Sequence, residues 1–168
     1  DLAVAATRDG RITALRGAVY ANMGAYIYPN SSGMVLGRTA LLLPGAYAIR
    51  NIDLTVYGVF TNTTPVGPYR GAGRPEAIYY IERLVDLVAG ELGLDPAEVR
   101  RRNFIPPDAF PYRTATGLTY DSGDYPAALE RALELVGYEQ VRREQQAAWQ
   151  RGQYVGVGLS SYVEPGGA

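Results

Sequence analysis

The chain has 168 residues, of which 47% are apolar and 20% charged, and its net charge at pH 7 is −1. Its length and apolar content suit one core, so we expect residues 1–168 to form a single segment of one domain. The near-zero charge, without a basic block, argues against nucleic acid or an anionic membrane as a partner. The longest apolar runs, such as residues 40–43, are too short to cross a bilayer, and no signal-peptide pattern is present. We therefore expect a cytoplasmic protein with no membrane span.

The chain contains no His and no Cys. It therefore lacks the residues for a usual zinc site, an iron–sulfur cluster, a Ser-His-Asp triad or a thiolate nucleophile. A transition metal would have to bring its own ligands, so we expect no protein ligand to a metal. The chain starts at Asp1 without an initiator Met and stops at Ala168 directly after an apolar run, which suggests a piece of a longer protein.

Residues 1–63 are expected to be strand-rich. Residues 2–7 and 12–23 are extended runs around the pair Asp9-Gly10, which is typical of a tight hairpin. Apolar residues on both faces of the second run suggest a strand inside a sheet or between layers.

Between this hairpin and the next strand we expect irregular structure. Residues 24–37 are rich in turn formers and predict a loop, and residues 37–47 form a short apolar segment, helical or extended, that ends at Pro44-Gly45. Residues 51–63 alternate apolar and polar side chains, which predicts a half-buried strand.

Residues 65–76 contain three glycines and three prolines, which disfavour both a helix and a central strand. They predict a shaped loop that leads into a helix, with Pro75 at the first helical position and with Gly71 and Gly73 allowing a close backbone approach. The free amides of such a corner suit an oxyanion, a phosphate or a metal-bound oxygen, and Arg70 and Arg74 add positive charge.

A purely structural corner is the alternative, because Gly-rich turns before helices are common. The loop is not a dinucleotide fingerprint, since Glu76 occupies the third glycine position of that motif. Arg38 leads a short apolar stretch, and its alternative role is a surface arginine paired with a carboxylate.

Residues 75–151 are expected to be mainly helical. Apolar residues recur at three and four positions up to Leu92, which predicts an amphipathic helix ending near Gly93. Asp95 and Pro96 are a helix-start signal, with Glu98 reaching back, for a second helix that runs to about Asn103.

Residues 104–123 show no period and are expected to wrap a partner or line a site that belongs to a missing portion. Asp124 predicts a helix that is closed by Gly137. Residues 138–151 predict a polar helix anchored by Val141 and Trp149. Residues 154–163 predict a final strand, whose glycines allow a close approach by a backbone or ligand. The expected fold class is α+β, a small mostly antiparallel sheet packed by three or four helices.

The run Pro-Tyr-Arg-Gly-Ala-Gly-Arg-Pro-Glu-Ala at residues 68–77, with Leu94-Asp95-Pro96 and residues 101–105, resembles a known family. It is similar to the molybdopterin-binding large subunit of the molybdenum hydroxylases, which include xanthine dehydrogenase, aldehyde oxidase and aerobic carbon monoxide dehydrogenase. The resemblance implies an internal segment of a catalytic subunit that is several times longer. Such an enzyme inserts a water-derived oxygen into a C–H bond of a small molecule. It passes electrons to an iron–sulfur small subunit and an FAD medium subunit.

The resemblance also implies a molybdenum–molybdopterin cofactor, in the cytosine dinucleotide form, whose dithiolene sulfurs hold the metal. That arrangement would account for the missing His and Cys. The family's catalytic glutamate lies beyond the end of this chain, and neither Glu76 nor Glu164 takes its place. We therefore expect the isolated segment to be inactive and to bind no cofactor by itself.

Residue roles follow from the same resemblance. The backbone amide of Arg70 would point at the metal's oxo-type ligand, with Gly71 and Gly73 also binding the cofactor. Ala72 would line the substrate site where xanthine-oxidising members carry an aromatic ring, which argues against purine stacking. Arg38 would stabilise negative charge on the substrate. Gly71 replaces the cysteine of established carbon monoxide oxidisers, which argues against copper-bridged chemistry.

A second function class is a non-catalytic binding or scaffold module, with a ligand surface for a saccharide built from the 14 tyrosines. Its alternative is that these tyrosines are buried in the core or at a subunit interface. The exposure of Tyr26, Tyr28, Tyr69 and Tyr112 bears on this choice.

Overall fold

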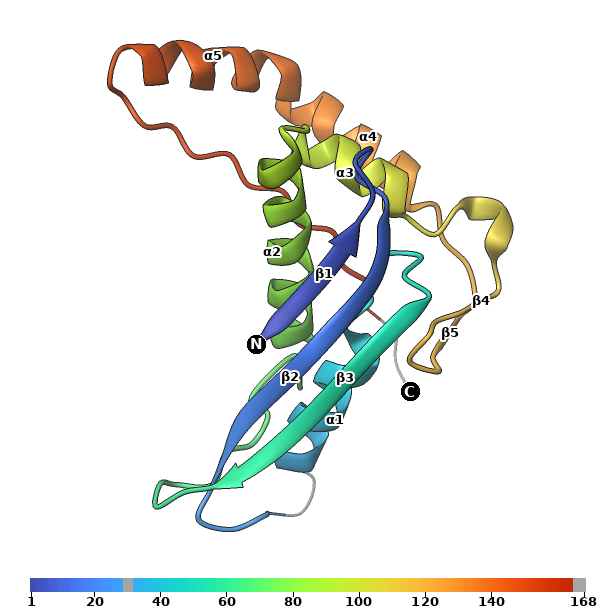
Figure 1. The fold of residues 1–168 in the computed structure, drawn as a ribbon, viewed down its shortest axis with the longest axis vertical. Helices are drawn as coiled ribbons and strands as arrows, with labels where there is room; N and C mark the ends of the chain where they lie inside the picture. The colour runs from blue at the N-terminus through green and yellow to red at the C-terminus, as the bar shows by residue number, and fades with distance from the viewer. Residues whose placement is uncertain (29–31, 165–168) are drawn as a thin grey trace.

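We describe residues 1–28 and 32–164 of a computed structural model of the chain (Figure 1). The elements in chain order are β1 (Leu2–Ala6), β2 (Ile12–Gly24), α1 (Ser32–Leu42), β3 (Asn51–Phe60), α2 (Arg74–Leu92), α3 (Pro96–Asn103), the 3-10 turn η1 (Pro107–Ala109), β4 (Tyr112–Arg113), β5 (Thr119–Tyr120), α4 (Tyr125–Val136) and α5 (Tyr138–Gln150).

The predicted hairpin and the strand predicted at residues 51–63 are both confirmed, and they form one sheet in the order β1-β2-β3. β1 pairs antiparallel with β2, whereas β3 runs parallel to β2, with Val19 opposite Val56. A parallel pair needs a crossover, and α1 lies in the connection between the two strands. A separate antiparallel pair joins β4 and β5. The α+β class is therefore confirmed, with a parallel pair in its main sheet.

The loop predicted for residues 24–37 is wrong from Ser32 onward, where α1 begins, and residues 29–31 lie outside the described part. Gly33 and Gly37 made a helix unfavourable by propensity alone. Partly buried Met34, Val35 and Leu36 provide the tertiary contacts that override this propensity.

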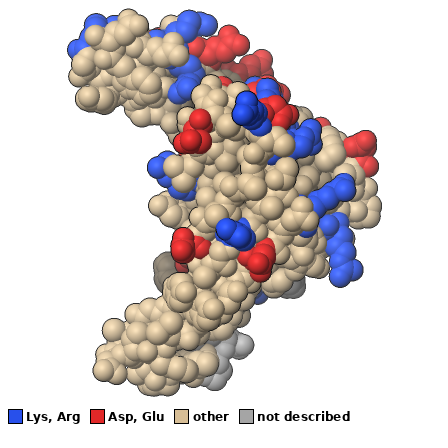
Figure 2. Space-filling view, viewed as in Figure 1, with Lys and Arg blue, Asp and Glu red and all other residues tan. Residues whose placement is uncertain are grey.

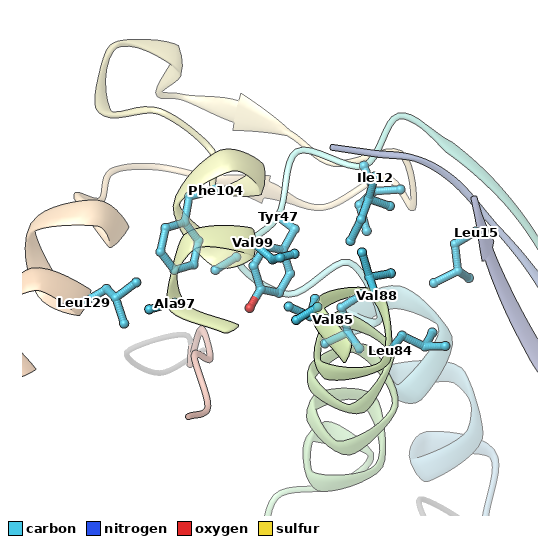
Figure 3. Packing of buried hydrophobic residues seen from close by; sticks show 14 of the residues in the cluster. Ile12, Leu15, Tyr47, Leu84, Val85, Val88, Ala97, Val99, Phe104 and Leu129 are labelled. Carbon is cyan, nitrogen blue, oxygen red and sulfur yellow. The ribbon is translucent and has the colours of Figure 1, made fainter. Parts of the chain in front are cut away.

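The core lies between the sheet and the long helix α2 (Figures 1 and 3). Ile12 and Leu15 of β2 face Leu84, Val85 and Val88, which recur on one side of α2. This spacing is the one that predicted an amphipathic helix, and α2 ends, as predicted, before Gly93 in the left-handed conformation.

Helix α3 is confirmed and starts where its cap predicts. The Asp95 carboxylate accepts a hydrogen bond from the amide of Ala97 at 2.8 Å. Glu98 does not reach back as predicted, because it pairs with Arg101 and Arg102 one turn further on.

Residues 104–123 are less irregular than predicted, since they contain η1 and the short β4–β5 hairpin. Thr114 closes the hairpin turn, with its amide donating to the carbonyl of Leu118 at 2.8 Å. Helices α4 and α5 are confirmed. Trp149 is not an anchor of α5, because it is 51% exposed, and the buried positions are Tyr138, Gln145 and Ala148.

The final strand predicted at residues 154–163 is wrong for the described chain, where this segment is extended but pairs with no strand. Side chains hold its backbone instead. Arg100 donates to the carbonyl of Leu159 and Gln145 to that of Val155, each at 2.8 Å. Gly156 and Gly158 have open space beside them, so no backbone comes close there.

Across the described ranges, no helix combines the length and the apolar content that a membrane span requires.

Candidate functional site

The loop before α2 has an unusual backbone. Gly71, Ala72 and Gly73 follow one another with φ values of +81°, +48° and +92°. Ala72 is the one residue other than glycine with positive φ in the described chain, and a side chain in that region is strained. Strained residues of this kind persist only where the surrounding structure holds them in place. They concentrate at functional sites.

Gly73 allows the loop to press against α1. A Cβ atom at this position would lie 2.4 Å from the carbonyl oxygen of Val35 and 2.8 Å from the amide nitrogen of Thr39. The Thr39 hydroxyl lies 2.8 Å from the carbonyl oxygen of Val35 and 3.2 Å from that of Gly73. Helix α1 and this hydroxyl therefore fix the end of the loop.

Helix α2 begins at Arg74, so Pro75 takes its second position and Gly73 is the cap. The amide of Arg74 donates to the carbonyl of Gly71, and that of Ala77 donates to the carbonyl of Gly73, each at 3.1 Å. These bonds close the turn at the start of the helix.

The amides from Arg70 to Gly73 find no acceptor in the described part of the chain. Within residues 1–28 and 32–164, the backbone N–H groups of Arg70, Gly71, Ala72 and Gly73 donate to no protein oxygen. Unpaired backbone donors need a partner, which is water on a wet surface and an anionic or polar ligand in a binding site.

Three of these four residues border a cavity of about 340 Å³, the loop cavity. Arg70, Ala72 and Gly73 line it together with residues at the end of β2 and on α1. Gly71 lies between these residues but does not line the loop cavity itself. Its own Cβ would meet the Pro75 ring at 2.8 Å, so this position also requires glycine.

Arg38 lies apart from the loop cavity. It is exposed on α1 and lines a second cavity of about 540 Å³ with Arg74, Tyr120, Tyr162 and Glu164. In the described ranges Arg38 has neither a hydrogen bond nor an ion pair. The carboxylate partner that its surface alternative required is therefore absent there, and its guanidinium is open to a ligand.

Sequence reasoning missed two features of this region. Arg74 places its Nε 3.0 Å from Glu164 Oε2, which ties the start of α2 to the extended segment 152–164. The Tyr120 hydroxyl donates to the carbonyl of Gly45 at 3.1 Å, and burial raises the pKa of this phenol to about 12. No local pattern links residues 75 or more positions apart, so only an alignment could have suggested these pairs.

The residues present fit a cofactor that carries its own metal ligands. In the part of the chain that the structure describes, no group of three His, Cys, Asp or Glu side chains is placed to hold a metal ion. The loop offers unpaired amide donors and a cationic Arg70, which suit the oxygen atoms of a bound group.

Residues 1–104 match the family described as the molybdopterin cofactor-binding domain. The chain belongs to this family. The resemblance expected from the loop sequence is therefore confirmed, and the loop before α2 lies inside the matched part of this molybdopterin cofactor-binding domain.

Similar proteins of known sequence or structure are consistent with this family. The carbon monoxide dehydrogenase large chain of Afipia carboxidovorans is 39% identical over 98% of this chain, and the match covers 21% of that protein. The 6-hydroxypseudooxynicotine dehydrogenase complex subunit gamma of Paenarthrobacter nicotinovorans is 33% identical over 99% of the chain and 21% of its own length. The crystal structure of quinoline 2-oxidoreductase from Pseudomonas putida 86 superimposes with a TM-score of 0.89 at 33% identity. It covers 96% of this chain and 21% of that one. The chain thus spans about a fifth of the relatives' length.

The tyrosine test does not separate the two function classes. Tyr26, Tyr28 and Tyr69 are exposed, and Tyr112 is partly buried. Exposed rings fit a ligand surface, but they equally fit a domain surface that further polypeptide covers. The family match favours the molybdopterin cofactor-binding domain.

Proposed function

We propose that the chain is an internal segment of the catalytic large subunit of a molybdopterin-dependent hydroxylase or dehydrogenase. Its substrates would be aldehydes, N-heterocycles or carbon monoxide. The observation that carries the proposal is the row of backbone amides from Arg70 to Gly73, which have no acceptor in the described ranges, beside the loop cavity that Arg70, Ala72 and Gly73 line. The family membership supports molybdopterin as the cofactor. The greater length of the relatives supports the proposal that the chain is one segment of a longer subunit.

In this proposal the chain supplies hydrogen bonds and shape. The amide of Arg70 would donate to an oxygen of the bound group, and Gly71 and Gly73 would keep the backbone close to it. Ala72 leaves room beside the substrate where a larger side chain would restrict it. The molybdenum–molybdopterin group, in the cytosine dinucleotide form, would supply the redox chemistry when bound.

Arg38 has a separate role in the proposal. Its free guanidinium would stabilise negative charge that develops on the substrate. Because Arg38 lines the second cavity, the substrate would have to reach from this cavity toward the loop, past Arg74. Polypeptide outside residues 1–168 would supply the catalytic base, and separate iron–sulfur and FAD subunits would complete the enzyme. The complete enzyme would be cytoplasmic.

The test uses the complete gene product that contains residues 1–168. It should contain molybdenum and pterin in equal amounts, measured by metal analysis and by fluorescence of the oxidised pterin. Gly73→Ala should lower both contents, because its Cβ would meet the Val35 carbonyl oxygen at 2.4 Å and displace the loop.

Gly93→Ala is the matched control. Gly93 also has positive φ, at +65°, but it has open space around it at the far end of α2. Its substitution should cost about 1 kcal/mol of stability and leave the cofactor content unchanged. A folded gene product without molybdenum or pterin would overturn the proposal.

A further inference from the structure

One end of the molecule carries no charge. Residues 17–37 and residues 54–69 contain no Asp, Glu, Lys or Arg. The pairing of β2 with β3 brings these two runs together, with Ala18 opposite Thr55 and Asn22 opposite Val59. Figure 2 shows charged side chains across the middle and top of the visible face and none at the end that β2 and β3 form. We call residues 17–28 and 54–69 the uncharged end.

The uncharged end exposes aromatic side chains. Because side chains alternate across a strand and Val19 is buried, Tyr20 points to the opposite face of the sheet, away from the core. It stacks on Tyr57 with ring centroids 4.9 Å apart, and the two residues are 66% and 46% exposed. Val59 and Phe60 are also exposed. Exposed aromatic surface without charges is typical of an interaction site.

The same end has an open sheet edge. β3 has ten residues and pairs with β2 on one side, while the described chain places no strand on its other side. Natural edge strands are usually short or guarded by charge, proline or a bulge. β3 contains no proline, and its one charged residue is Asp53, near the start of the strand. Its second half is an unguarded template for another strand.

We propose that a further segment of the same polypeptide, from outside residues 1–168, adds a strand to the outer edge of β3 and covers the Tyr20–Tyr57 pair with apolar side chains. This inference rests on the proposed function, because it requires the chain to be part of a longer subunit. The lengths of the relatives favour this occupant. In quinoline 2-oxidoreductase the same fold takes up only 21% of its chain, so most of that polypeptide lies outside the matched part.

The test places the photoreactive residue p-benzoylphenylalanine at Tyr57 in the complete gene product, where it replaces one aromatic ring by another. After irradiation, mass spectrometry of the digest identifies the peptide that is joined to β3. The expected result is an intramolecular link to a peptide outside residues 1–168, with the mass of the undigested subunit unchanged. The same residue at Tyr20 repeats the measurement if the Tyr57 variant does not fold.

Arg143 on the polar helix α5 is the matched control position, since its side chain is 65% exposed and lies among other charges. It should give at least tenfold less of that link than Tyr57. A link from Tyr57 to a second copy or to another subunit would overturn the inference, and so would the absence of any link. Molybdenum and pterin contents are measured on the same sample, so the inference can fail while the proposed function stands.

Discussion

Arg100 donates from Nε and Nη2 to one carboxylate oxygen of Glu82, at 3.0 and 2.7 Å, and its side chain is completely buried. Tyr47 donates to the other oxygen of Glu82. Burial, and then the Glu82 charge, raise the pKa of Tyr47 well above its usual value, so this phenol stays a neutral donor. Since Arg100 also binds the carbonyl of Leu159, this network joins α2 and α3 to the segment that carries Glu164.

Arg100→Leu should therefore be strongly destabilising. It leaves the buried carboxylate of Glu82 without its cation, which costs about 3–5 kcal/mol in comparable pairs. Arg101→Leu is the control, because Arg101 is partly exposed and pairs with Glu98 and Glu130 near the surface. It should cost no more than about 1 kcal/mol. Urea unfolding of both variants measures the difference, and equal losses would contradict a dominant role for the buried network.

Among the polar residues that hold the β1–β2 hairpin against α3, Asn103 should lose the most stability on substitution. Its buried side chain accepts from the amide of Ile12 at 2.7 Å and donates to the carbonyls of Gly10 and Val99, each at 2.8 Å. Asn103→Ala leaves buried backbone groups unpaired and should cost about 2–4 kcal/mol. Asn62→Ala, at an exposed position, should change the free energy of unfolding by less than about 0.5 kcal/mol. If both variants unfold at the same urea concentration, the Asn103 contacts do not hold the hairpin.

Tyr120 should contribute to a loss of stability at high pH, beside the other buried tyrosines whose pKa values are raised. Its pKa in the folded state is raised to about 12 by burial, while an unfolded tyrosine titrates near 10. The folded state therefore keeps the proton that the unfolded state loses, and stability decreases as the pH rises from about 10 to about 12. Tyr120→Phe should flatten this decrease. Tyr69→Phe, at a fully exposed ring, should not. Urea midpoints at pH 9 and pH 11.5 give the slopes, and the same slope for all three proteins would exclude Tyr120 as the cause.

Arg38 should affect turnover without affecting folding. It is exposed and has no partner in the described ranges, so Arg38→Ala should change stability by less than about 0.5 kcal/mol. In the complete enzyme its loss should lower kcat/KM by about tenfold or more if it stabilises charge in the transition state. Arg50→Ala removes an exposed arginine that lines neither cavity and is the control. Unchanged kcat/KM in a molybdenum-loaded Arg38→Ala enzyme would remove Arg38 from the site.

Much of the fold and the position of the candidate loop could be predicted because their causes are local. The Asp9-Gly10 turn, the apolar period along α2 and the cap at Asp95 each act within a few residues. The glycines and prolines of residues 65–76 likewise predicted a shaped loop from local composition. The first part of α1 was missed because Gly33 and Gly37 oppose a helix locally, and contacts with other elements override them.

The sequence by itself determined the class of the protein, the hairpin, most helices and the loop whose glycines allow left-handed backbone. Only the tertiary structure decided that β3 pairs parallel to β2, that residues 154–163 form no strand in the described chain, and that Arg38 and Ala72 line different cavities. The physical reason is the sequence separation of the residues that interact. Turn, cap and period energies depend on neighbouring residues, whereas strand pairing, buried ion pairs and cavities depend on residues that are far apart in the chain and meet only when it folds.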